Sequence, residues 1–392
     1  MKKVYLHNLA VGDVLARPAY LASGKLLFDA GVVVTEEVKD TLARYGVIEL
    51  YIEGEGQDPL QEEMKSDEVA RDAISPLLED YRNRTREMID KLIVGDEVGK
   101  EEVNFIVSGI IETVAFNKNV ALILSQFKGA EGTYLIPHSI NTTMFAVAVA
   151  KRMGYNNEDV ERIGMSAMLH DIGMAAILPQ IDGKERLSEE EWEMVRRHPA
   201  DGKKLAVEKF DIDDELILNG ILKHHERKDG SGYPDGLSGN QIEQTSYIVM
   251  VCDVYSALTT ERIYRKVGGD PSVVSILRVL STDDSERNSY LPYEAMRIIM
   301  ADTDRFYDVD VVKNLLYTVA IYPLGSLVML NTGEVGRVAS TTDNPFRPKV
   351  DILVDSKGVK LQEPYRLDLS EKANFRLYVV KGVTEEEYGL YY

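Results

Sequence analysis

The sequence predicts a mainly α-helical protein with a small α/β module at its N-terminus and a small β module at its C-terminus. Apolar residues recur at helical spacing through most of residues 58–320. Shorter β-like runs, separated by Gly and Asp turn residues, occupy residues 1–57 and return after residue 320. We therefore expect a regulatory-type module at 1–57, a helical connector at 58–130, a helical domain at 131–320 and a β module at 321–392.

The first two segments differ in their patterns. Residues 1–57 contain the strand-like runs KVYL, KLLFDAGVVV and VIELYIEG, with one helical stretch, TEEVKDTLARYG. The acidic segment that follows begins DPLQEEMKSDEVARDAISPLLEDY and has apolar residues at irregular helical spacing. It predicts a connecting helix, and a dimer-forming helix is the alternative.

The central segment predicts a series of helices. The stretches are HSINTTMFAVAVAKRMG, NNEDVERIGMSAMLHDIG, LSEEEWEMVRRHP, DDELILNGILKHHE, TSYIVMVCDVYSALTTERIY and DPSVVSILRVLST. Ser188 followed by Glu191 is a capping-box start for the third helix. Pro199 is expected to interrupt that helix close to His198.

The C-terminal segment predicts antiparallel strands. Its runs are GSLVMLNTGEVGRVAS, KVDILVDSKGVKL and FRLYVVKG. Turn pairs such as Thr332-Gly333 and Lys357-Gly358 divide them.

Charge and composition exclude several classes of protein. The net charge of −20 argues against a protein that grips a nucleic-acid backbone. No apolar run reaches the roughly 18 residues that cross a bilayer, and the N-terminus is a poor signal peptide. The single cysteine, Cys252, allows no internal disulfide, reads as a small buried hydrophobe and fits a reducing cytoplasm. A small anionic substrate would need local positive charge, which metal ions supply.

Five of the six histidines lie in the central segment, and two of them are adjacent. They are His138, His170, His198, His224 and His225, whereas His7 stands apart. Neighbouring helical residues point about 100° apart. The pair His170-Asp171 can therefore approach a metal cluster from two directions, with the carboxylate bridging two ions, and His224 and His225 can address two different ions.

One further carboxylate stands in an apolar stretch. Asp253 lies within YIVMVCDVYSAL, where it reads either as a ligand or as a helix-cap or ion-pair partner. We favour ligation. Imidazole and carboxylate ligands without thiolates suit Fe, Mn or Zn. Two such metals sharing a bridging water supply the hydroxide nucleophile and the phosphate clamp that phosphodiester hydrolysis needs.

This ordered set resembles that of the HD-domain metallophosphohydrolases. The stretch HHERKDGSGYPDGL is more specific and resembles the HD-GYP family, bacterial phosphodiesterases that open and degrade cyclic di-GMP. The similarity covers roughly residues 134–300 and includes HDIG, LSEEEWEMVRRHP and DVYSALTTERIYR. It implies an HD-type helical bundle, cyclic di-GMP as substrate, and two divalent ions, with Fe or Mn favoured over Zn.

The resemblance also implies roles for individual residues. The metal ligands would be His138, His170, Asp171, His198, His224, His225 and Asp253, with Asp171 bridging. Tyr233 and Pro234 fall in the loop that lies along the substrate, and Arg262 falls on an arginine that contacts it. Lys228 and Lys184 are further candidates for neutralising the phosphate.

Three positions depart from the family pattern. Met174 replaces the lysine of HDIGK, which should weaken transition-state stabilisation. Tyr134 replaces a glutamate of three-metal members, which implies two metals and linear pGpG as product. Ser256 replaces the second carboxylate of DVYDAL, which loosens support for the site.

Three functions follow as alternatives. The first is an active cyclic di-GMP phosphodiesterase in the cytoplasm, with no nucleic acid or membrane as partner. The second is a degenerate member that binds metals, and with them a cyclic dinucleotide, as a sensor or scaffold. The third is an HD phosphohydrolase for another nucleotide. Residues 1–57 resemble the regulatory segment before some HD-GYP domains, where homo-oligomerisation or a signalling partner would act.

Overall fold

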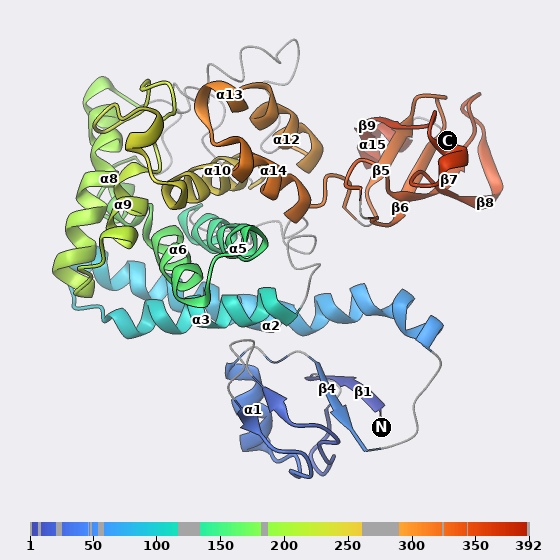
Figure 1. Cartoon of the computed structure of the whole chain (residues 1–392), viewed down its shortest axis with the longest axis horizontal. Helices are drawn as coiled ribbons and strands as arrows, with labels where there is room; N and C mark the ends of the chain where they lie inside the picture. Colours follow the sequence, from blue (N-terminus) through green and yellow to red (C-terminus); the bar gives the residue numbers. More distant parts are fainter. Residues whose placement is uncertain are drawn as a thin grey trace.

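The computed structural model describes residues 2–6, 9–20, 26–45, 47, 49–53, 59–116, 134–181, 187–260, 290–323, 325–342 and 344–389. Within them, the fold is mainly helical, with a small N-terminal α/β module and a small C-terminal antiparallel sheet, as the sequence predicts (Figure 1). The predicted helix in DPSVVSILRVLST lies outside the described residues.

The N-terminal module has a hydrophobic core of its own. Strand β1 (Lys2–Tyr5) pairs antiparallel with β4 (Glu49–Ile52), and β2 (Ala19–Tyr20) pairs with β3 (Leu26–Phe28). Helix α1 (Glu36–Arg44) starts at Thr35, whose side chain accepts the Val38 N–H at 3.2 Å. Leu15, Val34 and Leu42 are among the buried residues of this core, which is separate from that of the central helices.

The acidic segment forms one long helix. Helix α2 (Pro59–Val94) is followed by α3 (Lys100–Phe116). Helix α2 packs against α3, against α5 (Leu135–Met153) and against the 3₁₀ helix η2 (Ile172–Ala176). In Figure 1 the α2–α3 pair runs along one side of the helical domain, between it and the N-terminal module.

Two buried helices form the centre of the helical domain. Most residues of α5 and of α10 (Gln244–Thr259) are buried, and the two helices pack together. Around them lie α6 (Asn157–Leu169), α8 (Glu189–Phe210), α9 (Glu215–Lys223), α12 (Pro292–Ala301) and α14 (Val309–Thr318). The shorter elements are α7 (Leu178–Ile181), η3 (Gly239–Gln241) and α13 (Thr303–Phe306).

Helix α8 confirms one prediction and corrects another. Ser188 and Glu191 form the predicted capping box. The helix nevertheless continues through Pro199, so the expected interruption is wrong. Proline lacks an N–H and leaves the carbonyl of Val195 without its helical donor. The ring nitrogen Nδ1 of His198 donates to that carbonyl instead, so the helix continues without an orphaned acceptor.

The C-terminal strands form one antiparallel sheet in the order β8-β7-β6-β5-β9. They are β5 (Leu327–Leu330), β6 (Val335–Ser340), β7 (Lys349–Val354), β8 (Lys360–Asp368) and β9 (Val379–Val383), accompanied by η4 (Lys372–Asn374) and α15 (Glu385–Gly389). The predicted turn pairs join β5 to β6 and β7 to β8.

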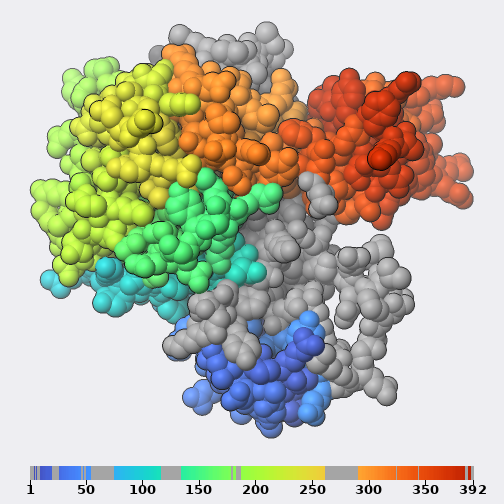
Figure 2. All heavy atoms as spheres, in the orientation of Figure 1, coloured from blue at the N-terminus to red at the C-terminus, as the bar shows by residue number. Residues whose placement is uncertain are grey.

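The sheet packs on the helical domain at α12. A Cβ added at Gly382 of β9 would lie 2.8 Å from the Tyr293 ring, so this side chain of α12 lies against the backbone of β9. Figure 2 shows the sheet at one end of the molecule, beside the residues of α12 and α14. Among the described residues, no helix is long and apolar enough to cross a membrane.

Candidate metal centre

Five helices bring the predicted ligands to one buried place. His138 lies in the first turn of α5, His170 and Asp171 follow α6, and His198 lies in the middle of α8. His224 and His225 follow α9, and Asp253 lies on α10. The side chains of His138, His170, His198 and His224 are at most 2% exposed, and that of Asp171 is 13% exposed. The chain therefore gathers all seven residues, although they span 116 positions of sequence from residue 138 to residue 253.

Two glycines allow the turn after α6 to touch α8. A Cβ added at Gly173 would lie 2.1 Å from the carbonyl oxygen of His198 and 2.7 Å from the backbone nitrogen of Gly202. No larger residue fits at Gly173 unless the backbone moves. The main-chain contact fixes Asp171, two residues earlier, beside His198.

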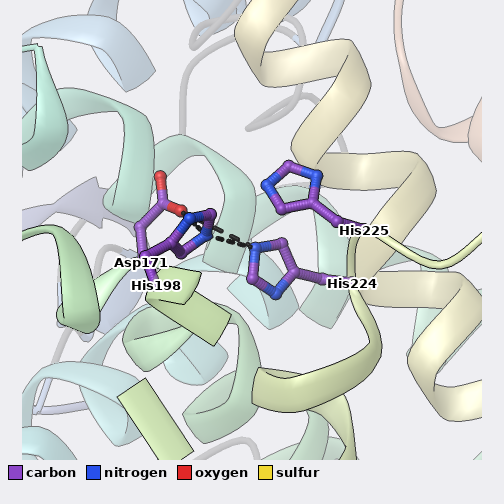
Figure 3. A group of neighbouring side chains, drawn as sticks. All are labelled: Asp171, His198, His224 and His225. Atoms are coloured by element: carbon purple, nitrogen blue, oxygen red, sulfur yellow. Dashed lines mark hydrogen bonds and ion pairs between the residues drawn. The ribbon is translucent and has the colours of Figure 1, made fainter. Parts of the chain in front are cut away.

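The two carboxylate oxygens of Asp171 face different histidines. Oδ1 lies 3.1 Å from Nε2 of His198 and 3.7 Å from Nε2 of His224. Oδ2 lies 3.4 Å from Nε2 of His170 and 3.6 Å from Nε2 of His138. Figure 3 shows Asp171, His198 and His224 converging, with His225 beside them. One carboxylate thus connects two pairs of imidazoles.

Hydrogen bonds define which ring nitrogen is free in three of these histidines. Nδ1 of His170 contacts the Ala167 carbonyl at 2.7 Å, and Nδ1 of His224 contacts the Ile221 carbonyl at 2.7 Å. Nδ1 of His198 contacts the Val195 carbonyl in the same way. A carbonyl oxygen only accepts, so each Nδ1 carries the hydrogen. The Nε2 atoms that face Asp171 are therefore the ones with lone pairs in the neutral rings.

The pKa values describe a cluster in which the carboxylates stay ionised. Burial would raise the pKa of Asp171, but the charge on His170 and hydrogen bonds from its histidine neighbours hold it well below its usual range. Burial lowers the pKa of His170, yet the Asp171 carboxylate outweighs this effect and raises it to about 9. Burial lowers the pKa of His224 to about 4. The cluster thus offers carboxylate oxygens and at least one neutral imidazole.

The donor set suits divalent cations. Among the described residues, two groups have ligand atoms within 4.8 Å of one another. One group holds His138, His170 and Asp171, and the other holds Asp171, His198, His224 and His225. Nitrogen and carboxylate donors without thiolate match Fe, Mn or Zn. The Nε2 atoms of His138 and His170 lie only 3.2 Å apart, a spacing that a shared cation stabilises.

Two details refine the expected ligand arrangement. His224 and His225 fall in the same group, whereas their adjacency predicted one ion for each. Asp253 lies beside the other group, with its Oδ1 3.0 Å from Nε2 of His138 and 3.8 Å from Nε2 of His170. Ligation by Asp253 stays a prediction, because its carboxylate also serves here as a partner of His138.

The three departures from the family pattern surround the cluster. Oγ of Ser256 lies 2.9 Å from Nδ1 of His138, and the hydroxyl donates to the His138 carbonyl at 3.3 Å. This serine therefore orients His138, where the sequence predicted a loosened support. The Tyr134 ring stacks on His138 with centroids 4.7 Å apart. Met174 lies half-buried in η2 and presents no charge.

The glycine-rich loop after α9 folds back over the histidine pair. The Tyr233 ring stacks on His225 with centroids 4.6 Å apart, and the Tyr233 N–H donates to the His225 carbonyl at 3.2 Å. Gly230 and Gly236 have φ values of +79° and +64°, which favour glycine. Pro234 is exposed. Tyr233 thus lies against His225, one of the predicted ligands.

The sequence reasoning missed Glu226. Its side chain is fully buried, and its two oxygens accept the backbone N–H groups of Asp235 and Leu237, each at 2.8 Å. Burial raises the pKa of Glu226, and these N–H groups oppose that rise. Its position directly after the histidine pair could have indicated a role at the site. The sequence alone, however, does not distinguish a buried carboxylate from an exposed one.

The remaining predicted contacts are less defined. Arg262 and Lys184 lie outside the described residues. Lys228 lies at the base of the loop, where its N–H donates to the Phe306 carbonyl at 3.0 Å. Cys252 is buried, and burial raises the pKa of its thiol, as expected of a small hydrophobic residue.

Comparisons with known proteins match two regions of the chain. Residues 110–278 match the HD domain family, and residues 327–390 match a KOW domain associated with the HD domain. The second region is the C-terminal sheet.

Three curated relatives illustrate the similarity. The cyclic di-GMP phosphodiesterase PA4108 of Pseudomonas aeruginosa is 30% identical over 62% of this chain and 53% of its own length. The cyclic di-GMP phosphodiesterase PdeB of Borreliella burgdorferi is 28% identical over 58% of this chain and 54% of its own length. The 3'3'-cGAMP-specific phosphodiesterase 1 of Vibrio cholerae is 26% identical over 50% of this chain and 44% of its own length.

The chain spans about half the length of these curated relatives. Residues 110–278, which match the HD domain family, contain the histidine and aspartate cluster and the glycine-rich loop. The HD domain match, the curated relatives and the HHERKDGSGYPDGL stretch all indicate similarity to HD-domain phosphodiesterases. Residues 110–278 thus form an HD domain, and it resembles those of the HD-GYP family.

Proposed function

We propose that this protein is a metal-dependent phosphodiesterase that hydrolyses cyclic di-GMP to linear pGpG. One observation carries the proposal: the two oxygens of Asp171 face separate groups of histidine Nε2 atoms, beside the Gly-Tyr-Pro loop. The names of the relatives from P. aeruginosa and B. burgdorferi support the substrate. A small-molecule substrate also agrees with the net charge of −20, which disfavours nucleic acid.

The residues of the chain would have two roles, to bind the two metal ions and to orient the ligands. His138, His170 and Asp253 would hold one ion, His198, His224 and His225 the other, and Asp171 both. When bound, two divalent ions supply Lewis acidity towards the phosphate and lower the pKa of water. Ser256 and the backbone carbonyls of α6, α8 and α9 would keep the ring nitrogens aimed inward.

The loop and the cationic residues would hold the substrate. Tyr233 and Pro234 would lie along it, while Arg262, Lys228 and Lys184 would offset the charge of the phosphates. Met174 offers no donor at the turn after Asp171, so the turnover would be lower than with a lysine there. Tyr134 stacks on His138 and brings no carboxylate, which supports two ions and release of pGpG.

Two other functions remain as alternatives. A sensor or scaffold that binds metals and cyclic dinucleotide without turnover is favoured by Met174, which supplies no charge at the turn after Asp171. Hydrolysis of another cyclic dinucleotide is favoured by the relative from V. cholerae, whose name specifies 3'3'-cGAMP. We place the protein in the cytoplasm, with residues 1–57 as the module through which a signalling partner or a second copy would act.

The product of a metal-loaded reaction tests the proposal. The full chain is purified without oxygen, loaded with Fe(II) or Mn(II), and incubated with cyclic di-GMP, 3'3'-cGAMP and a panel of nucleoside phosphates. Chromatography should detect pGpG from cyclic di-GMP. Binding without turnover would select the sensor, and turnover of another nucleotide alone would select the third function.

The matched control uses Asp171→Ala and Glu193→Gln. Asp171→Ala removes the carboxylate that both groups share and should abolish hydrolysis. Glu193→Gln changes an exposed carboxylate of α8 that pairs with Arg196 and should leave hydrolysis unchanged. Full activity of Asp171→Ala would exclude the metal mechanism for every substrate in the panel.

A further inference from the structure

A buried carboxylate connects the histidine pair to the glycine-rich loop. Glu226 follows His225 directly and is fully buried. One oxygen accepts the Asp235 N–H at 2.8 Å, and the other accepts the Leu237 N–H at 2.8 Å. Both oxygens of one side chain therefore accept hydrogen bonds from the backbone of the loop at residues 230–238.

The loop is also packed tightly against Glu226 on its near side. A Cβ added at Gly232 would lie 2.4 Å from the Cα of Glu226 and 2.4 Å from the backbone nitrogen of Arg227. Tyr233 comes next, with its ring stacked on His225. Two features thus hold the same short segment of the loop. Gly232 allows its close approach to Glu226, and the Glu226 carboxylate bonds to Asp235 and Leu237 further along the segment.

Hydrogen bonds to a buried charge are costly to replace. A carboxylate is acceptor-only and satisfies both N–H groups, whereas the amide of glutamine has one acceptor oxygen and one NH₂ group. Glutamine at 226 would leave one buried N–H facing another donor, which costs the full desolvation of that group. The geometry therefore depends on the carboxylate and not only on the size of the side chain.

We propose that Glu226 is a positioning residue that holds the loop carrying Tyr233 beside the candidate metal centre and thereby sets substrate affinity. This inference rests on the proposed function for its kinetic part. Both carboxylate oxygens of Glu226 accept hydrogen bonds from the loop backbone, so loss of the carboxylate should disturb the loop before it disturbs the ligands. Loss of the Glu226 carboxylate should therefore raise KM, while kcat and metal content are retained.

Hydrogen exchange tests the anchoring without any need for catalysis. In Glu226→Gln, amide exchange in the peptide that covers residues 230–238 should quicken by about tenfold or more, the ratio that loss of a charge-assisted hydrogen bond produces. Glu243→Gln is the matched control, because its carboxylate pairs with Lys223 on the surface of the same region. Equal exchange in Glu226→Gln and the wild type would overturn the proposal.

Kinetics test the consequence for substrate. Metal-loaded Glu226→Gln should retain the wild-type metal content and raise KM for cyclic di-GMP by about tenfold, with kcat changed much less. Gly232→Ala displaces the same loop without altering the carboxylate and should raise KM in the same direction. Loss of metal and kcat in both variants, with KM unchanged, would assign Glu226 a purely structural role and overturn the proposal.

The two proposals fail in different ways. If the wild type neither binds nor hydrolyses cyclic di-GMP, the proposed function fails, and hydrogen exchange alone decides whether Glu226 anchors the loop. If the wild type is active and Glu226→Gln has wild-type KM, the proposed function stands and the positioning role fails.

Discussion

The Nε2 atoms of His198 and His224 lie 3.0 Å apart, while Nδ1 of each ring donates to a backbone carbonyl. Two neutral rings held in this way would point lone pairs at each other inside a buried site. A shared proton relieves this repulsion, and so does a metal ion, which also satisfies Asp171. The arrangement thus favours cation binding before any substrate is considered.

Metal loading should stabilise the fold. With Mn²⁺ at about 100 times its Kd, the free energy of unfolding should rise by roughly 2.7 kcal/mol over that of the chelated protein. Denaturant titration with and without EDTA measures the difference. A double variant, His198→Ala with His224→Ala, should show a smaller rise, and an unchanged wild-type midpoint would argue against a metal centre.

The two ligand groups should be separable by metal analysis. His170→Ala should lose mainly the ion of the first group, His198→Ala mainly that of the second, and Asp171→Ala both, because Asp171 faces each group. Elemental analysis of the purified variants gives the stoichiometry, with Glu193→Gln as control. Full metal content in Asp171→Ala would contradict the bridging arrangement.

Ser256 should tune metal affinity through His138. In Ser256→Ala, Nδ1 of His138 loses its hydroxyl partner, and metal affinity should fall by about tenfold or more, as for other residues that orient a ligand. Competition with a chromogenic chelator measures the affinity. Ser246→Ala, another buried serine of α10, is the matched control. Equal affinity of Ser256→Ala and wild type would mean that packing alone orients His138.

A lysine at position 174 should increase turnover. Met174 lies at the turn after Asp171, and a cation there would stabilise charge developing on the phosphate. We expect Met174→Lys to raise kcat for cyclic di-GMP by about tenfold or more. Met174→Leu should leave kcat near the wild-type value. An inactive Met174→Lys with normal metal content would show that the residue does not face the substrate.

Pro199→Ala should separate stability from metal affinity. Alanine supplies the N–H that proline lacks and suits the interior of α8 better, so the chelated protein should become more stable. The new N–H would compete with His198 Nδ1 for the Val195 carbonyl, so metal affinity should fall. Chelated unfolding and metal titration measure the two quantities. A rise in both would contradict the role assigned to this carbonyl.

The sequence predicted the elements better than their contacts. The capping box at Ser188 is local, since three residues decide it, and it forms as predicted. The continuation of α8 through Pro199 could not be predicted, because it depends on a side chain that rotates onto the orphaned carbonyl. Helix propensity gives the free-energy cost of a proline inside a helix. It does not reveal a side chain, such as His198, that replaces the lost hydrogen bond.

The sequence predicted which residues gather at the candidate site but not how their side chains contact one another. Residue type and order identified the histidines and Asp171, since these side chains are unusual in apolar helices. Which histidines lie in one group depends on how α9 ends, so adjacency alone does not decide whether His224 and His225 address one ion or two. The roles of Ser256 and Glu226 depend on backbone atoms that no residue pattern reveals. The ligand assignments themselves stay predictions until metal is measured.

The contact between Gly173 and α8 bears on which cations this protein accepts. Only glycine at position 173 lets the two main chains come this close, so a residue with a Cβ there would push Asp171 and His198 apart. First-row transition ions, with bonds of about 2.0–2.2 Å, need less room than calcium, whose bonds to oxygen reach about 2.6 Å. Glycine at position 173 should therefore favour cations with short bonds over calcium.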